Sequence, residues 1–171
     1  ETAPEIARAN QTLHRVTGRL RAEYDIPLGQ AYVRPKADID VSHISMPAYK
    51  ETGASFMDMV FDKTSKTVVA LTPTLELGGR VGHGSTIARL YSDVGLTYVV
   101  NPTWSQQGRF EGAPDDAVFA TEFRSPQLVG NLSIGSEIIA WKKFAIQVEY
   151  NGTFNRNYVE HAGTGRVSYR F

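Results

Sequence analysis

The closing stretch of the chain, residues 158–171, alternates between apolar and polar side chains. Val159, Val167, Tyr169 and Phe171 share one set of alternate positions, and mostly polar or charged residues occupy the other set. Because successive side chains of a β-strand point to opposite faces, this pattern predicts a strand with one apolar and one polar face. A soluble sandwich buries the apolar face under a second sheet, whereas a membrane barrel turns it to lipid and turns the polar face to a lumen.

The same period of two recurs along most of the chain. It predicts seven strands, over residues 14–26, 32–42, 67–81, 85–100, 127–140, 144–155 and 158–171. Most of them are much longer than the roughly 5–6 residues typical of globular sheets, and they can cross a bilayer at a tilt. Pro35 lies inside the second strand and cannot donate to the ladder, which predicts an edge or a distorted pairing there. Residues 1–13 are expected to form a loop or a short helix before a barrel domain that covers residues 14–171.

The connections between these strands alternate in length. Those near residues 27–30, 82–84 and 141–143 are short, whereas those near residues 47–66 and 102–125 are long. With the final strand running towards the periplasm, the short turns lie on the periplasmic side and both long loops lie outside the cell, as in outer-membrane barrels. A soluble sandwich does not explain this alternation. We therefore predict an all-β, antiparallel up-and-down transmembrane β-barrel in the bacterial outer membrane.

Charge and composition exclude several classes of protein and of binding site. The 171 residues carry 18 basic and 18 acidic side chains, so the balanced charge provides no electrostatic surface for nucleic acid. The absence of cysteine excludes disulfides and thiolate metal sites. The sequence contains no apolar run of about 18 residues, so it predicts no transmembrane helix. A secretion signal is expected to lie upstream or to have been removed. The negative mean hydropathy is compatible with a barrel, because half of its strand positions are polar.

The sequence predicts no catalytic, cofactor or metal site. The four histidines, His14, His43, His83 and His161, fall on different elements without the spacing of metal ligands. The turn around His83 superficially resembles that of a nucleophilic serine, but it joins two strands rather than a strand and a helix. We therefore expect no enzyme activity.

Charged residues of both signs occupy the polar faces of the predicted strands. In a barrel they would line the lumen, where ion pairs between neighbouring strands can stiffen the wall and hydrate the channel. The predicted lumen-facing charges are Arg15, Arg19, Arg21, Glu23, Arg34, Lys36, Asp38, Asp40, Glu76, Arg80, Arg89, Asp93, Glu137, Glu149, Arg166 and Arg170. In a soluble sheet the same residues would form an ordinary solvated face.

Six short segments, taken in order and with their spacing, resemble the autotransporter β-domain, the translocator of type V secretion. They are AEYDIPLG at 22–29, YVRP at 32–35, GA at 53–54, FEGAP at 110–114, EYNGTF at 149–154 and RVSYRF at 166–171. The resemblance implies a twelve-stranded barrel whose lumen carries a helix or hairpin of the passenger during export. It also implies that the barrel-assembly machinery reads the terminal strand, with Val167, Tyr169 and Phe171 as the C-terminal assembly signal.

Seven predicted strands depart from this pattern, because a closed single-chain bacterial barrel normally has an even number of strands. Either about five strands lie upstream, or residues 55–61 pair as an eighth strand of a smaller barrel. We favour the C-terminal seven to eight strands of a twelve-stranded barrel.

The expected function is a translocator or anchor that exports or tethers an upstream passenger domain at the bacterial cell surface. The expected partners are outer-membrane lipid, the barrel-assembly machinery and a passenger segment in the lumen, with no nucleic acid. The alternatives are a soluble β-barrel or sandwich that binds a ligand, and a small porin-like channel.

Overall fold

The computed structural model of the chain is almost entirely antiparallel β-sheet, which confirms the predicted fold class, and it describes residues 6–54, 57–114, 116–140 and 143–170. Contacts divide the chain into two compact units, one of residues 1–18, 40–69 and 101–125 and the other of residues 19–39, 70–100 and 126–171. The strands are β1 (His14–Glu23), β2 (Ile26–Leu28), β3 (Ala31–Met46), β4 (Tyr49–Lys50), β5 (Met59–Phe61), β6 (Thr64–His83), β7 (Thr86–Val99), β8 (Thr103–Phe110), β9 (Phe119–Arg124), β10 (Leu128–Ala140), β11 (Phe144–Phe154) and β12 (Val159–Tyr169).

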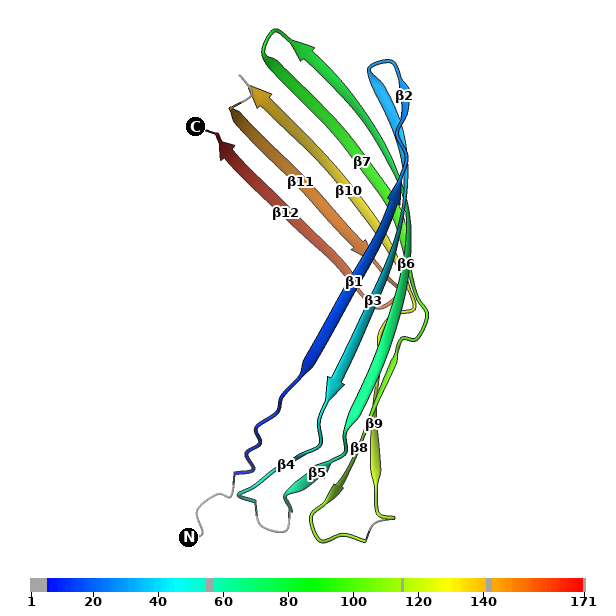
Figure 1. The fold of residues 1–171 in the computed structure, drawn as a ribbon, viewed down its shortest axis with the longest axis vertical. Helices are drawn as coiled ribbons and strands as arrows, with labels where there is room; N and C mark the ends of the chain where they lie inside the picture. The colour runs from blue at the N-terminus through cyan, green and yellow to red at the C-terminus, as the bar shows by residue number, and fades with distance from the viewer. Residues whose placement is uncertain (1–5, 55–56, 115, 141–142, 171) are drawn as a thin grey trace. The chain divides into compact units, whose positions relative to one another are not determined.

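Seven long strands form the main sheet in the order β1-β3-β6-β7-β10-β11-β12, with the short β2 paired to β3. Each long strand therefore pairs with the long strands that precede and follow it in the chain, which is the predicted up-and-down arrangement. In the second unit, β7, β10, β11 and β12 lie side by side (Figure 1) and pair along almost their whole lengths. All seven predicted strands form, because an alternating pattern of this length can satisfy both faces of a pleated strand.

Two of the predicted short turns are hairpins with two-residue loops. Gly29 and Gln30 separate β2 from β3, and Gly84 and Ser85 separate β6 from β7. The first loop residue has a φ of +70° at Gly29 and +59° at Gly84. Two-residue hairpin loops favour glycine at such positions because side chains disfavour positive φ. In the third short turn, residues 141 and 142 lie outside the described residues.

Pro35 distorts the pairing of β3. The backbone N–H of Tyr24 donates to the carbonyl of Pro35 at 3.2 Å, and at this point β1 ends and β2 has not yet begun. Because proline has no N–H to return the bond, the ladder is interrupted and the predicted strand 14–26 divides in two. Since β3 pairs on both sides, the proline marks a distorted pairing rather than an edge.

The two long connections pair with each other in a separate four-stranded sheet. Its order is β4-β5-β8-β9, and Met59 and Phe61 of β5 are partners of Phe110 and Gly108 of β8. The three residues of β5 rise only about 10 Å, too little to cross a bilayer. The alternative in which residues 55–61 add an eighth strand to the main sheet is therefore wrong; positions 55 and 56 themselves lie outside the described residues.

A small aromatic core holds this sheet of the first unit together. The rings of Tyr49 and Phe61 are stacked with centroids 4.7 Å apart, and Phe119 meets Phe61 edge-on at 6.1 Å. The buried carboxylate of Asp58 accepts the backbone N–H of Ala54 at 2.8 Å, which closes the loop before β5. The connections are therefore folded, with aromatic packing at the centre and a capped loop beside it.

Residues 6–13 contain no helix, and Arg8 forms an isolated antiparallel bridge with Thr52 in the first unit. Residues 1–5 lie outside the described residues.

Candidate functional site on the polar face

The central strands of the main sheet cover side chains of their polar face and expose those of their apolar face, whereas β1 and β12 are exposed on both faces. Glu76 is only 3% exposed, whereas Leu90 and Val148 on the opposite face are 65% and 57% exposed. Among the described residues, no large side chain is fully buried. A sheet folded in water shows the reverse order, because removal of apolar surface from water drives folding. The apolar face is therefore suited to an apolar medium.

Glu76 of β6 is the centre of the most connected group of side chains. Its Oε1 accepts hydrogen bonds from the Tyr32 hydroxyl and from Arg89 Nη2, each at 2.5 Å. Its Oε2 accepts from Lys36 Nζ at 2.9 Å, and Arg34 Nη1 lies 3.5 Å from Oε1. These partners come from β3 and β7, the strands that flank β6. Charged donors from both sides replace the water that the buried carboxylate has lost.

The ring of Tyr32 gathers three guanidinium groups. The Cζ atoms of Arg34, Arg80 and Arg89 lie 5.2, 5.4 and 5.7 Å from its centroid, within the range of cation–π contacts. Arg80 and Arg89 are direct cross-strand partners, and like charges in that position normally destabilise a sheet. The electron-rich Tyr32 ring and the Glu76 carboxylate offset this repulsion.

The group extends through two cations to two further carboxylates. Lys36 Nζ donates to Asp93 Oδ1 at 2.5 Å, and Arg34 Nη2 donates to Asp25 Oδ2 at 2.9 Å. We call this group the Glu76 cluster; its members are Asp25, Tyr32, Arg34, Lys36, Glu76, Arg80, Arg89 and Asp93. Four of its side chains are positive and three are negative, so the cluster is nearly balanced with one positive charge in excess.

A second tyrosine connects the Glu76 cluster to β11. The Arg89 guanidinium lies 4.7 Å from the ring centroid of Tyr91, and the Tyr91 hydroxyl donates to Glu149 Oε2. Glu149 Oε1 also accepts from Asn151 Nδ2 at 2.8 Å, and Gln147 Nε2 donates to the Tyr91 hydroxyl at 3.2 Å. The polar network therefore runs from β3 across to β11.

Each of the two tyrosines crosses the neighbouring strand at a glycine. A Cβ added at Gly78 of β6 would overlap the ring of Tyr32, and a Cβ added at Gly135 of β10 would overlap the ring of Tyr91. Tyr32 thus passes over β6 to reach β7, and Tyr91 passes over β10 to reach β11. A glycine within a strand often marks such a close approach, and a covering aromatic ring compensates for its missing side chain.

The structure brings together about half of the predicted lumen-facing charges. Those in the Glu76 cluster are Arg34, Lys36, Glu76, Arg80, Arg89 and Asp93. Glu149 joins them through Tyr91. Arg21 and Asp38 form a separate bidentate pair, with Nε–Oδ1 and Nη2–Oδ2 distances of 2.7 and 2.8 Å.

The other predicted charges lie outside this network. Arg15 Nε donates to Ser42 Oγ at 3.1 Å, and Arg19 and Asp40 have interactions of their own. Within the part of the chain that the structure describes, no ion pair joins the Glu76 cluster to the remaining members, which are Glu23, Glu137, Arg166 and Arg170.

Two residues of the predicted assembly signal belong to the apolar set of β12, a strand whose residues are exposed on both faces. Val167 is 68% exposed and Tyr169 is 58% exposed. Phe171 lies outside the described residues. The signal itself stays a prediction.

Reasoning from charge alone misses Tyr32 and Tyr91, the two side chains that connect the network. A usable signal exists in the sequence, because each tyrosine stands in the polar set of its strand. The next long strand carries a glycine in its own polar set, Gly78 or Gly135. A large aromatic residue on one strand and a glycine on the same face of the next strand together predict that the aromatic ring passes over the glycine.

The described residues contain no group of three or more His, Asp or Glu side chains that could hold a metal ion. None of the helical structure in the described ranges is long and apolar enough to cross a membrane. The polar face offers fixed charges of both signs, tyrosine hydroxyls and amides, a combination that hydrates a surface and makes many weak contacts with a polar chain.

Comparison with known sequences adds a family to this geometry. The family model described as autotransporter beta-domain matches residues 2–151, which is most of the chain and includes the whole Glu76 cluster. No curated protein matches the chain.

Proposed function

Because the chain belongs to the autotransporter β-domain family, we propose that it exports or tethers an upstream passenger domain at the bacterial cell surface. Membership places the chain in the bacterial outer membrane as part of a transmembrane β-barrel, in a family of translocators rather than of enzymes. The observation that carries the proposal is the inverted burial of the main sheet, with Glu76 covered and Leu90 and Val148 exposed.

In the proposed orientation the polar face lines the lumen and the apolar face contacts lipid. A basic side chain on the lipid side of a barrel costs about 2–4 kcal/mol at the bilayer midplane. The Glu76 cluster alone holds four basic side chains on one face, so the reverse orientation would place all of them in hydrocarbon. This cost supports the lumen-facing role that we propose for the charges of the Glu76 cluster.

The partner proposed for this polar face is a segment of the passenger in transit. The near balance of charge in the Glu76 cluster favours weak contact with a passing polar chain, because neither sign dominates the surface. Its cations and carboxylates are largely engaged with each other, which leaves the surface hydrated rather than strongly binding. We assign it no catalytic role.

The second proposed partner is the barrel-assembly machinery, which would read Val167, Tyr169 and Phe171. Support comes from the place of β12 at the end of the main sheet. A strand edge without a partner cannot remain in a bilayer, because its backbone N–H and C=O groups would be unsatisfied. A machine that inserts the barrel must therefore handle this edge.

Export is tested with an epitope tag placed in the passenger of the full-length protein. On intact cells the tag is expected to be cleaved by added protease and to bind antibody, while a variant truncated before β12 displays no tag. If the barrel assembles, as judged by heat-modifiable gel mobility, but the tag stays in the periplasm, the export proposal fails. A steady open conductance of that assembled barrel in planar bilayers would then identify a channel.

Orientation is tested with adjacent single cysteines on β11, since the natural chain has none. Gln147→Cys on the polar face is expected to react with a membrane-impermeant maleimide, and Val148→Cys on the apolar face is expected to stay unreacted. Each variant is the matched control of the other. Labelling in the reverse order would overturn the proposed orientation.

A further inference from the structure

The four-stranded sheet of the first unit has an edge that no described strand pairs. Among the described residues β9 pairs only with β8, and its six residues run from Phe119 to Arg124. From Ala120 to Arg124 every residue is exposed. An exposed strand edge presents unpaired backbone N–H and C=O groups, so it can accept a further strand.

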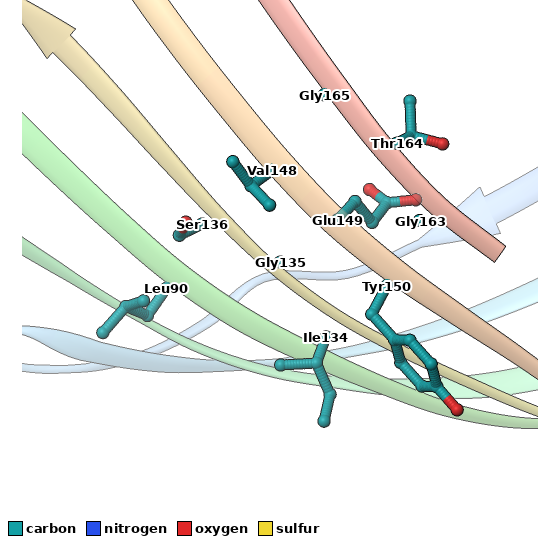
Figure 2. A pocket seen from close by; sticks show the side chains of 10 residues that line it. All are labelled: Leu90, Ile134, Gly135, Ser136, Val148, Glu149, Tyr150, Gly163, Thr164 and Gly165. Carbon is teal, nitrogen blue, oxygen red and sulfur yellow. The ribbon is translucent and has the colours of Figure 1, made fainter. Parts of the chain in front are cut away.

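This edge differs in origin from the edge of β12. Figure 2 shows Gly163 and Gly165 on β12, the last strand of the main sheet, and a closed barrel pairs that edge with its first strand. β9 continues through residues 125–127 into β10, whose partner β11 ends at Phe154, opposite Gly130. β11 then turns back towards β12 and has no residues left to pair with β9. The free edge of β9 thus comes from the length of its neighbour and not from a missing strand.

The backbone groups that point away from β8 include those of Glu122 and Arg124. The N–H of Ser125 donates to the carbonyl of Pro102, in the segment between β7 and β8, at 2.9 Å. Successive residues of a strand direct their N–H and C=O groups to opposite sides. Those of Ser125 and Phe123 therefore point to β8, and those of Glu122 and Arg124 point to the open side, where an added strand would exchange hydrogen bonds with them.

The side chains of this edge are complementary to a second copy of themselves. Glu122 and Arg124 have opposite charges, and their side chains form no hydrogen bond or ion pair with another described residue. When two copies of β9 lie antiparallel with Phe123 on the two-fold axis, Glu122 of each copy faces Arg124 of the other. A shift of the pairing by two residues in either direction would set Glu122 against Glu122, or Arg124 against Arg124, and like charges in such positions destabilise a sheet.

We propose that β9 is the contact surface for a second copy of this chain, paired antiparallel through Glu122 and Arg124. One face of the joined sheet then carries both Glu122–Arg124 pairs. On the other face the two Phe123 side chains, each 64% exposed in the single chain, become direct partners beside Trp104 of β8. Charged side chains normally protect a strand edge from pairing, whereas here their order along β9 favours one partner and one register. The inference depends neither on passenger export nor on the proposed orientation.

The test is native mass spectrometry of the full-length protein, extracted in mild detergent, over a series of protein concentrations. The wild type is expected to form dimers. Glu122→Arg sets arginine against arginine, and Arg124→Glu sets glutamate against glutamate, so each variant alone is expected to dimerise about tenfold or more weakly. Asp116→Arg is the matched control, because it reverses an exposed charge outside β9 and is expected to dimerise like the wild type.

A mixture of the two reversed variants separates the contact from a folding defect. In a mixed pair the introduced arginine faces the introduced glutamate, and the native arginine faces the native glutamate. The mixture is therefore expected to recover dimers that contain one copy of each variant. Two variants that had merely failed to fold would not recover on mixing.

Single cysteines test the register, since the natural chain has none. Phe123 is at a non-hydrogen-bonded position of the proposed pairing, where the Cα atoms of partners are about 4.5 Å apart, within the range of a disulfide. Phe123→Cys is expected to cross-link two copies under mild oxidation. Thr121→Cys is the control, because the two copies of this residue would lie roughly 13 Å apart along the strands.

Three results would overturn the inference: a wild type that is monomeric at every concentration, a mixture that recovers no dimer, or equal cross-linking at positions 121 and 123. The outcomes also separate it from the proposed function. Charge-reversed variants that lose the dimer while the passenger tag stays on the cell surface support both. A tag that never reaches the surface in wild-type cells, together with charge-dependent dimers, counts against export alone.

Discussion

Replacement of Glu76 by glutamine is expected to destabilise the barrel more than the loss of any other charge on the polar face. The side chain keeps its shape in Glu76→Gln, but its amide group now directs N–H donors towards side chains that are donors themselves. Lys36 and Arg89 then lose a carboxylate partner at 2.9 and 2.5 Å. The cross-strand repulsion between Arg80 and Arg89 is no longer offset.

The size of the effect follows from the contacts that are lost. Hydrogen bonds to charged groups contribute about 1.5–3 kcal/mol each, and the removal of one partner from a buried ion pair costs about 3–5 kcal/mol. The face borders a hydrated lumen in the proposed orientation, which lets water replace part of the loss, so we expect about 2–3 kcal/mol. At about 2–4 °C per kcal/mol for a chain of this size, the transition falls by about 4–12 °C.

The measurement is the temperature at which the folded gel band of the detergent-solubilised barrel converts to the unfolded band. Glu160→Gln is the matched control, because Glu160 lies in the polar set of β12, has the uncharged Thr153 as its cross-strand partner and is not part of the Glu76 cluster. Arg89→Gln alone is also expected to lower the transition, and the double variant is expected to lose less than the sum of the two single losses. This coupling separates the ion pair from a general effect of altered charge.

Two results would refute the reasoning. A shift for Glu76→Gln no larger than that for Glu160→Gln would mean that the carboxylate is not a structural centre. Additive losses in the double variant would mean that Glu76 and Arg89 do not act through each other.

Three further outcomes are expected. Gly135→Val places a branched side chain under the ring of Tyr91 and is expected to lower the transition by the equivalent of about 1–3 kcal/mol, with Gly18→Val, at an uncovered glycine, as the near-neutral control. Asp58→Ala leaves two backbone N–H groups of the first long connection without their acceptor; added protease is expected to cut this connection faster on intact cells while the barrel transition stays unchanged. Deletion of Phe171 is expected to reduce the fraction of heat-modifiable barrel in cells, and an unchanged fraction would remove it from the assembly signal.

The strands of the main sheet could be predicted because a single physical rule controls them. A strand between two different environments must alternate, and the alternation in this chain is long enough to outweigh local irregularities. Pro35 shows where the rule becomes incomplete. The missing N–H predicts a disturbed ladder, but only the structure shows that the neighbouring strand breaks after Glu23.

The pairing of the long connections could not be predicted from the same rule. β5 has three residues, too few to display a period, and its partner β8 begins more than 40 residues later in the chain. What brings them together is aromatic packing around Phe61, a tertiary contact without a local pattern. Propensity read along the chain has no access to such a contact.

For the candidate site, the sequence predicts the face but not the pairings. Alternation places Arg80 and Arg89 in the polar sets of β6 and β7, yet a shift of the register by two residues would preserve both faces and change every partner. The meeting of Arg80 with Arg89, and of Tyr32 with Gly78, therefore depends on the hairpin that sets the register. In this chain that is the two-residue loop at Gly84.

The two faces of the main sheet contribute differently to the stability of the barrel wall. Backbone ladders connect each strand only to its immediate neighbours, but on the polar face Tyr32 connects β3 to β7 and Tyr91 connects β7 to β11. Such connections between second neighbours resist sliding of the strand that lies between them. If β6 or β10 shifted along its axis, a residue with a Cβ would replace Gly78 under the ring of Tyr32, or Gly135 under the ring of Tyr91, and would overlap that ring. Side-chain contacts on the polar face thus help to fix the register of the strands. The apolar face needs no comparable connections, because its side chains contact lipid in the proposed orientation.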